Sequence, residues 1–261
     1  MKRLAALLIA VTACGGGASQ RIVIGAGTTV VDSGFVEAVV AAYEDQHNRQ
    51  ISIVGESSQR LLDLARRGEV DILITHEPDA LAAFVEEGSA TRSDAVFAST
   101  FLLVGPPERG LIGSEAAEVF SEIAASGLPF VSRADGSGTY LQESIFWALA
   151  GVDPTNEPWY QTTGQGMGFT MQVADQRGAF VVVEEGAWIE AADKLSLVEV
   201  DIGVWPNVYS ATVVAGSGEG AAEDFYNWLI SDDGAEAVRL ANEELFGLPV
   251  YRYLLAERSL P

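Results

Sequence analysis

Three short segments rich in glycine and hydroxyl residues have the residue types that suit binding of an anion. They are Gly27-Thr28-Thr29, Gly55-Glu56-Ser57-Ser58 and Asp135-Gly136-Ser137-Gly138-Thr139. Each precedes a stretch with helical spacing, so each is expected to open a helix. The first turn of a helix has unpaired N–H groups and a partial positive charge, and short hydroxyl side chains add donors. Taken singly, each segment is better explained as helix capping, but three that converge predict an oxyanion cage.

Arg133 immediately precedes the third segment and is the cation best placed to bind such an oxyanion. Its planar guanidinium presents several N–H donors in a fixed fork, which suits a tetrahedral anion. The alternative is an ion pair with one of the 37 Asp and Glu residues. Asp32 and Asp135 are expected to accept hydrogen bonds from backbone N–H groups in turns rather than to form an acid pair.

Signatures of common enzyme chemistry are absent from the sequence. It has no GxSxG nucleophile motif, no GxxxxGK[ST] phosphate loop and no HExxH zinc motif. His47 and His76 are the only histidines and Cys14 is the only cysteine, so a zinc site would need several carboxylates. We expect His76 to have a packing or capping role where a strand ends, the alternative being that it lines a cleft. No catalytic residue, metal ligand or cofactor is predicted.

The elements that must position these segments alternate between short apolar runs and amphipathic stretches. We expect strands near residues 22–24, 51–54, 70–74, 101–104, 128–132, 180–183, 197–200 and 208–214, with helices between them and two more near 221–230 and 235–244. Continuous runs rich in Val and Ile, separated by helices, predict an α/β fold whose sheets are covered on both faces. In the helix after the third segment, Leu141, Ile145, Phe146 and Leu149 are expected to face inward.

The composition limits the functions that this chain can have. It carries 15 Lys and Arg against 37 Asp and Glu, a net charge of −22, and its only lysines are Lys2 and Lys194. Proteins bind nucleic acid largely by neutralising phosphates with Lys and Arg, so nucleic acid is excluded as a partner. With 48% hydrophobic residues in 261 positions, the chain is long enough for one large or two small globular domains.

The N-terminus has the pattern of a secretory signal. Lys2 and Arg3 precede an apolar stretch at residues 4–11, which is too short to span a membrane. Val11-Thr12-Ala13-Cys14 looks like a bacterial lipobox, so we predict a signal peptide at 1–13, a lipid on Cys14 and a flexible tether at 14–20; the alternative is an ordinary signal with an incidental thiol. Loss of Lys2 and Arg3 takes the net charge to −24. The expected location is the cell envelope, outside the cytoplasm.

Six motifs occur in the order and spacing of a known family. They are TTVVDSG at 28–34, GEVDILITH at 68–76, VGP at 104–106, FVSRADGSGT at 130–139, WY at 159–160 and GQGM at 164–167. In these motifs the chain resembles the tungstate-binding substrate-binding proteins of ABC importers. The resemblance covers essentially the whole mature chain, and the combination of SRADGSGT with WY and GQGM is its most specific part.

This resemblance implies a two-lobed type II periplasmic-binding-protein fold, in which mixed sheets are flanked by helices and two crossover strands join the lobes. Lobe 1 is expected at residues 21–104 and 208–261, and lobe 2 at 105–207. Trp159 and Tyr160 are expected to pack inside lobe 2. The ligand-binding residues expected from the segments and the resemblance together are Thr28, Thr29, Ser58, Arg133, Ser137, Gly138, Thr139, Gly166 and Met167.

The implied function is capture of an oxyanion, tungstate above all, and its delivery to an ABC permease with its ATPase. A monomer that touches the membrane only through its lipid is expected. The chain departs from the family pattern where Ala26-Gly27-Thr28-Thr29 replaces a run of four hydroxyl residues, where Ser57-Ser58-Gln59 replaces Gly-Thr-Gly, and where Tyr140 replaces histidine. Molybdate, sulfate or phosphate therefore remain alternative ligands, and a sensor or an enzyme on the same fold remain alternative functions.

Overall fold

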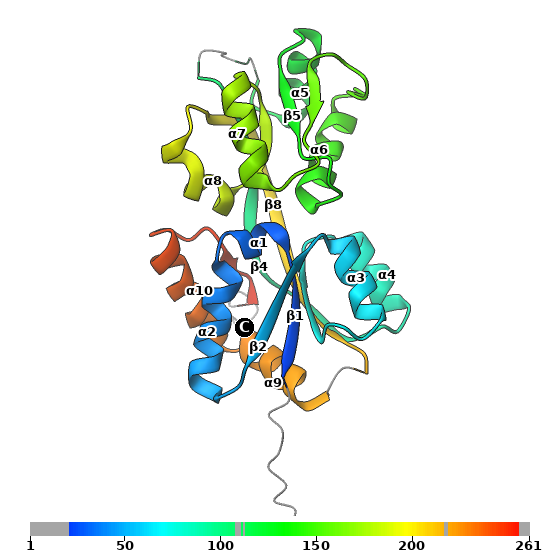
Figure 1. Ribbon diagram of the computed structural model, residues 1–261, viewed down its shortest axis with the longest axis vertical. Coiled ribbons are helices and arrows are strands. Elements are labelled where there is room, and N and C mark those ends of the chain that lie inside the picture. The colour runs from blue at the N-terminus through cyan, green and yellow to red at the C-terminus, as the bar shows by residue number, and fades with distance from the viewer. Residues whose placement is uncertain (1–20, 108–110, 112, 217–218, 256–261) are drawn as a thin grey trace, which may run out of the picture.

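The computed structural model describes residues 21–107, 111, 113–216 and 219–255, and it shows two lobes joined by two long strands (Figure 1). These strands are β4 (Ala90–Gly105) and β8 (Val198–Val214), which pair antiparallel from Ala90 opposite Val214 to Gly105 opposite Val198. They are the two crossover strands that the resemblance implies. Neither strand is interrupted between the lobes, so the proposed boundaries at 104/105 and 207/208 stay predictions. Cys14, the signal peptide and the tether lie outside the described residues.

Each lobe has its own set of helices and strands. Lobe 1 contains β1 (Ile22–Gly27), α1 (Thr28–Asp32), α2 (Phe35–His47), β2 (Ile51–Glu56), α3 (Ser58–Arg66), β3 (Ile72–Thr75), α4 (Pro78–Glu86), α9 (Glu219–Leu229), α10 (Asp232–Leu245) and β9 (Arg252–Tyr253). Lobe 2 contains α5 (Ala116–Ala125), β5 (Phe130–Ser132), α6 (Gly138–Leu149), β6 (Tyr160–Thr162), α7 (Met167–Arg177), β7 (Val181–Glu184), α8 (Glu185–Ala191) and a 3-10 turn at Ala192–Lys194.

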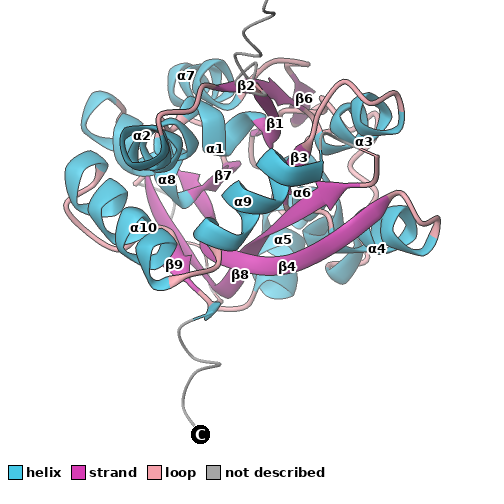
Figure 2. Cartoon of the chain, turned by 90° about the horizontal axis from the view of Figure 1, so that it is seen from below, coloured by secondary structure: helices cyan, strands magenta, loops and turns pink. Residues whose placement is uncertain are grey.

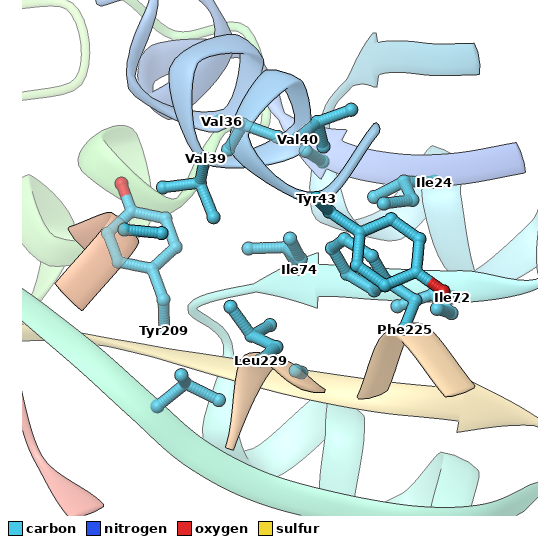
Figure 3. Close-up of a cluster of buried hydrophobic side chains, with 14 of the residues drawn as sticks. Ile24, Val36, Val39, Val40, Tyr43, Ile72, Ile74, Tyr209, Phe225 and Leu229 are labelled. Atoms are coloured by element: carbon cyan, nitrogen blue, oxygen red, sulfur yellow. The ribbon is translucent and has the colours of Figure 1, made fainter. Parts of the chain in front are cut away.

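The sheet of lobe 1 is mixed and is covered on both faces, as predicted. Its strand order continues through the crossover strands as β2-β1-β3-β8-β4-β7, with β1 parallel to both β2 and β3 and with β8 antiparallel to β3. Alternate side chains of a strand point to opposite faces. Ile72 and Ile74 accordingly enter a core with α2, α9 and α10 (Figure 3), while Leu73 enters another with α3 and α4. Figure 2 shows α2 and α10 on one side of the sheet and α3 and α4 on the other.

Lobe 2 is smaller and is built on β7, which pairs antiparallel with β4. The parallel pair β5–β6 extends from it through a bridge between Phe130 and Phe180. One core packs α5 and α6 on β5, and another packs α7 and α8 on β7. Trp159 and Tyr160 pack against the first of these cores, which confirms that prediction.

Two details of the sequence-based prediction are wrong. Leu141, Ile145 and Leu149 are 42, 49 and 51% exposed, whereas Phe146 on the opposite face of α6 is buried. Apolar residues at i, i+4 and i+8 predict a buried stripe, but Leu141 and Ile145 of this stripe line an open groove. The apolar runs at 197–200 and 208–214 belong to one strand, because β8 continues through the polar residues between them.

Candidate anion-binding site

Three strand ends in lobe 1 bring predicted site residues to one edge of the sheet. Strands β1, β2 and β3 run parallel, with Gly27 beside Glu56 and Ala26 beside Ile74. Parallel strands end at a common edge, and ligands bind at that edge in α/β sheets. Helix α1 begins there at Thr28, and helix α3 begins there at Ser58.

Arg133 of lobe 2 crosses the cleft and contacts this edge. It follows β5, and its guanidinium is 2% exposed. Nη1 donates to the Thr29 hydroxyl at 3.2 Å, and Nη2 lies 3.4 Å from the Thr28 hydroxyl. The structure therefore brings Thr28 and Thr29 of the first glycine- and hydroxyl-rich segment together with Arg133, the predicted cation, which precedes the third segment. An anion inserted at this contact would accept hydrogen bonds from both lobes.

The loop after Arg133 folds back and holds the guanidinium in place. Ala134 and Gly136 both have positive φ, 47° and 73°, which turns the chain sharply. Asp135 accepts from Arg133 Nε at 3.0 Å and Nη2 at 2.6 Å, and its other oxygen accepts from the Ser137 N–H at 3.1 Å. The expected turn role of Asp135 is confirmed. The ion pair that was the alternative for Arg133 is present, and the same side chain also contacts Thr28 and Thr29, so its role in binding an anion stays a prediction.

Two buried hydroxyls near this contact lack a hydrogen-bond partner. Ser58 and Thr139 are 0 and 1% exposed, and neither hydroxyl oxygen is bonded within the described residues. Buried polar groups are almost always paired, so these two unpaired hydroxyls at helix N-termini are candidates to donate hydrogen bonds to a ligand. Ser137 differs, because its hydroxyl caps α6 by accepting from the Tyr140 N–H at 3.4 Å.

The other two predicted residues, Gly166 and Met167, lie at the N-terminus of α7. The preceding loop is tied to Arg133, whose carbonyl accepts from the Gly164 N–H at 2.8 Å. Gly166 is exposed and occupies the N-cap position. The Met167 side chain is buried in the core beside α8, so only its backbone can face a ligand. A ligand role for either residue stays a prediction.

His76 lies at the lobe interface, where sequence reasoning favoured mere packing or capping. It follows β3 and stacks on Tyr209 with ring centroids 4.9 Å apart. A methyl group added at Gly138, the first residue of α6, would lie 2.2 Å from the imidazole, so the lobes approach closely here only because residue 138 is glycine. The alternative that His76 lines a cleft is thus the correct one. Its place at the end of a parallel strand, next to β1, was the signal in the sequence.

A groove of about 720 Å³ opens beyond His76 and Gly138. The exposed side chains Leu141 and Ile145 of α6 line this groove, together with Pro206 and Val208 of β8. The groove is mostly apolar, whereas Arg133 and the hydroxyls lie outside its lining. The His76 imidazole therefore lies between an apolar groove and the hydrogen-bond donors of the candidate anion-binding site.

A buried acid supports the lobe 2 half of the site. Glu143 on α6 accepts hydrogen bonds from Tyr160 at 2.7 Å and from the Trp147 indole at 3.2 Å. Burial raises the pKa of Glu143 from 4.5 to about 7, although these hydrogen bonds act in the opposite direction. This network links α6, which carries Ser137 and Thr139 at its start, to β6 and so to β5, which leads into Arg133. Nothing in the sequence alone paired Glu143 with Tyr160.

The residues gathered here supply hydrogen-bond donors and one buried guanidinium, with no arrangement of nucleophile and base. In the described part of the chain, no three His, Cys, Asp or Glu side chains lie together in a way that could hold a metal. Over the same residues, no helix is both long and apolar enough to cross a membrane. What the arrangement can do is bind an anion between two lobes.

Two lobes on paired crossover strands, with anion donors on both sides of the cleft, define a two-lobed solute-binding protein. The PBP superfamily domain matches residues 13–233, and the chain belongs to this superfamily. A protein of Haloferax volcanii named as an ABC transporter anion-binding protein is 32% identical over 186 residues, which cover 70% of this chain and 54% of that protein. This chain thus spans about half the length of that relative.

Two further relatives extend the comparison. The tungstate-binding protein TupA of Peptoclostridium acidaminophilum is 25% identical over 248 residues, covering 90% of this chain and 86% of that protein. The solved structure of the tungstate-binding protein TupA from Desulfovibrio alaskensis G20 has a TM-score of 0.77 at 26% identity, covering 90% of this chain and 98% of that chain. The predicted fold class and the predicted resemblance to tungstate-binding proteins of ABC importers are both confirmed.

Proposed function

We propose that this protein is the solute-binding component of an ABC importer and that it captures a tetrahedral oxyanion, tungstate first among them. The observation that carries the proposal is the contact of buried Arg133 with Thr28 and Thr29 across the cleft. Ser58 and Thr139 supply two more buried donors without partners. The choice of tungstate is supported by the relatives that are named for this ion.

Attraction for the ligand is local rather than global. With a net charge of −24 after loss of Lys2 and Arg3, the protein repels a dianion, but salt largely screens this repulsion at distances beyond a Debye length. Within the cleft, the guanidinium and the helix N-termini act at contact distance, where each charge-assisted hydrogen bond contributes about 1.5–3 kcal/mol. Several such bonds are enough to offset the unfavourable long-range field.

A calorimetric titration of the mature domain with tungstate, molybdate, sulfate and phosphate tests the proposal. Tungstate or molybdate is expected to bind most tightly, with one site per chain. Molybdate, sulfate and phosphate are the second candidates, since the same donors suit any tetrahedral oxyanion. The proposal is wrong if none of the four ions binds.

Delivery to a permease and its ATPase completes the proposed function, with Cys14 as a lipid-modified anchor outside the cytoplasm. Cys14 follows Ala13 in the lipobox pattern, and residues 14–20 would then tether the domain to the membrane surface. Mass spectrometry of the mature protein should find a lipid-modified N-terminal Cys14, and Cys14→Ala should leave soluble protein or precursor. A different mature N-terminus would remove the anchor. A sensor role on the same fold would be favoured if no permease binds the loaded protein.

A further inference from the structure

His76 is held in a fixed orientation by neighbours on the crossover strands. Its Nδ1 lies 2.6 Å from Oδ1 of Asn207, and its ring stacks on Tyr209. Asn207 is itself buried, and its amide nitrogen donates to the Tyr209 hydroxyl at 3.0 Å and to the Ser99 hydroxyl at 3.4 Å. The position of each atom of this amide is therefore fixed by hydrogen bonds on both sides.

The orientation of the Asn207 amide assigns the hydrogen of His76 to one ring nitrogen. The amide is placed with its nitrogen toward the hydroxyls of Ser99 and Tyr209, so its oxygen faces the imidazole and accepts. Nδ1 of His76 must then donate, which leaves Nε2 of the neutral ring with a free lone pair. The pKa of His76 is lowered from 6.5 to about 4, mainly by burial and also by the nearby guanidinium of Arg133, while the Asn207 bond acts in the opposite direction. The empty protein therefore has a neutral imidazole at neutral pH.

The free nitrogen lies between two of the anion-binding segments. A methyl group built at Gly138 would lie 2.5 Å from Nε2, and one built at Gly27 would lie 3.6 Å from it. Gly27 immediately precedes Thr28, and Gly138 lies between Ser137 and Thr139. No described residue donates a hydrogen bond to Nε2. An acceptor thus borders a site whose other groups are donors.

Resting on the proposed function, we propose that His76 Nε2 shares one proton with the bound oxyanion, so that a fully deprotonated anion such as tungstate binds together with one proton from solvent. An oxyanion oxygen and a bare imidazole nitrogen are both acceptors, and a proton between them turns repulsion of lone pairs into a hydrogen bond. A dianion beside the ring also favours its cationic form.

The charged and titratable groups around the His76 ring differ in whether they favour or disfavour its protonation. Arg133, from the loop before α6, disfavours the imidazolium, but its charge is shared with Asp135 and with the bound anion. Tyr209 on β8 stacks on the ring, and burial raises the pKa of its hydroxyl well above 10, so it stays neutral. Glu77 follows His76 along the chain, and burial raises the pKa of its carboxyl. The bound anion adds the negative charge that makes protonation of His76 favourable.

Calorimetry in buffers with different ionisation enthalpies measures the protons taken up on binding. For sodium tungstate, we expect an uptake that approaches one proton per ion at about pH 6, and an association constant that falls by up to about tenfold per pH unit above it. His76→Gln should abolish the uptake and this pH dependence. His47→Gln and Glu77→Gln are the matched controls and should both keep the wild-type uptake.

Nitrogen NMR of the histidine rings gives a second test that needs no variant. His47 and His76 are the only histidines of the chain, and His47 lies at the far end of α2, where it serves as an internal reference. Tungstate should shift the Nε2 resonance of His76 from the unprotonated toward the protonated range and leave His47 unchanged.

The outcomes separate this inference from the proposed function. Tungstate binding without proton uptake anywhere between about pH 5.5 and 8, or uptake that persists in His76→Gln, overturns the role of His76 and leaves the proposed function standing. Uptake that is lost in Glu77→Gln alone overturns it too, because the proton then belongs to the carboxylate. Failure of wild-type protein to bind tungstate, molybdate, sulfate or phosphate overturns the proposed function itself.

Discussion

The two sides of the cleft approach the same anion with different groups. Lobe 1 offers neutral hydroxyls after the ends of β1 and β2, among them Ser58, which has no hydrogen-bond partner within the described residues. Lobe 2 also has an unpartnered hydroxyl, at Thr139, but it adds a buried guanidinium that Asp135 already holds in position. A group that is fixed before binding loses little entropy when the ligand arrives. The comparison teaches that lobe 2 supplies charge and orientation, while lobe 1 completes the cage when the lobes close.

Removal of Arg133 should have the largest effect. Arg133→Ala deletes the buried cation and leaves Asp135 near the ligand, so the affinity for tungstate should fall by more than about 100-fold, or about 3 kcal/mol. Arg133→Lys keeps the charge without the planar fork, so its affinity for tungstate should lie between those of the wild type and Arg133→Ala. Calorimetry measures both variants. A change of less than about threefold in Arg133→Ala would place the guanidinium outside the site.

The buried acid behind Arg133 makes the stability of lobe 2 depend on pH. Glu143 has a pKa of about 7 when folded and 4.5 when exposed, so its protonated form favours the folded state. This stabilisation is complete below about pH 4.5 and is lost as the pH rises to about 7, a change of roughly 3 kcal/mol. Glu143→Gln keeps an oxygen for Tyr160 and Trp147 without the charge, and it should raise the free energy of unfolding at about pH 8.

Urea unfolding at about pH 5 and pH 8 measures this difference, with exposed Glu86→Gln as the control. Glu184, buried at the end of β7, has its pKa raised to about 7 by burial as well, so part of the pH dependence should remain in Glu143→Gln. Equal loss of stability with pH in the variant and in the wild type would assign the whole effect to other groups.

A methyl group at residue 138 should hinder closure without disturbing either lobe. In Gly138→Ala the added carbon would lie 2.2 Å from the His76 ring, which its bond to Asn207 and its stack on Tyr209 keep from moving. We expect about a tenfold loss of tungstate affinity and a smaller contraction in small-angle scattering when ligand is added. Gly168→Ala, which has open space around it, is the control. Wild-type contraction in Gly138→Ala would show that the lobes do not meet there.

Effects no larger than that of Gly138→Ala should come from the single hydroxyls, where stability and affinity should move in opposite directions. Ser58→Ala and Thr139→Ala each remove a single donor, at the lower end of the range for a charge-assisted hydrogen bond, about 1.5 kcal/mol or roughly tenfold in affinity. Both also remove a buried polar atom that has no partner in the empty protein, so thermal stability should stay equal or rise slightly. A loss of stability without a loss of affinity would make these hydroxyls structural.

The sequence sufficed for those parts of the site that depend on local pattern. Thr28, Ser58 and Ser137 each lie where an apolar run gives way to a helix, so their place at helix N-termini follows from spacing. The role of His76 did not follow, because it depends on Gly138 and Asn207, which lie 62 and 131 positions further along the chain and meet it only in the fold. The same holds for Glu143, whose pKa is set by burial rather than by sequence neighbours.

The amphipathic pattern of α6 shows why even a correct helix assignment can misplace a site. Leu141 and Ile145 have the spacing of a buried stripe, yet they line an open groove beside His76. Periodicity reveals that a face is apolar, but not what covers it.

The central claim is that one oxyanion binds between the hydroxyls of lobe 1 and the guanidinium of lobe 2, and a crystal structure of the tungstate complex tests it most directly. Tungsten scatters anomalously, so its position can be found without prior assumptions about the ligand. We expect a single strong peak from which the oxygens of the ion reach the Arg133 guanidinium and the hydroxyls of Ser58 and Thr139. A peak in the apolar groove lined by Leu141 and Ile145, or one that contacts a single lobe, would contradict it.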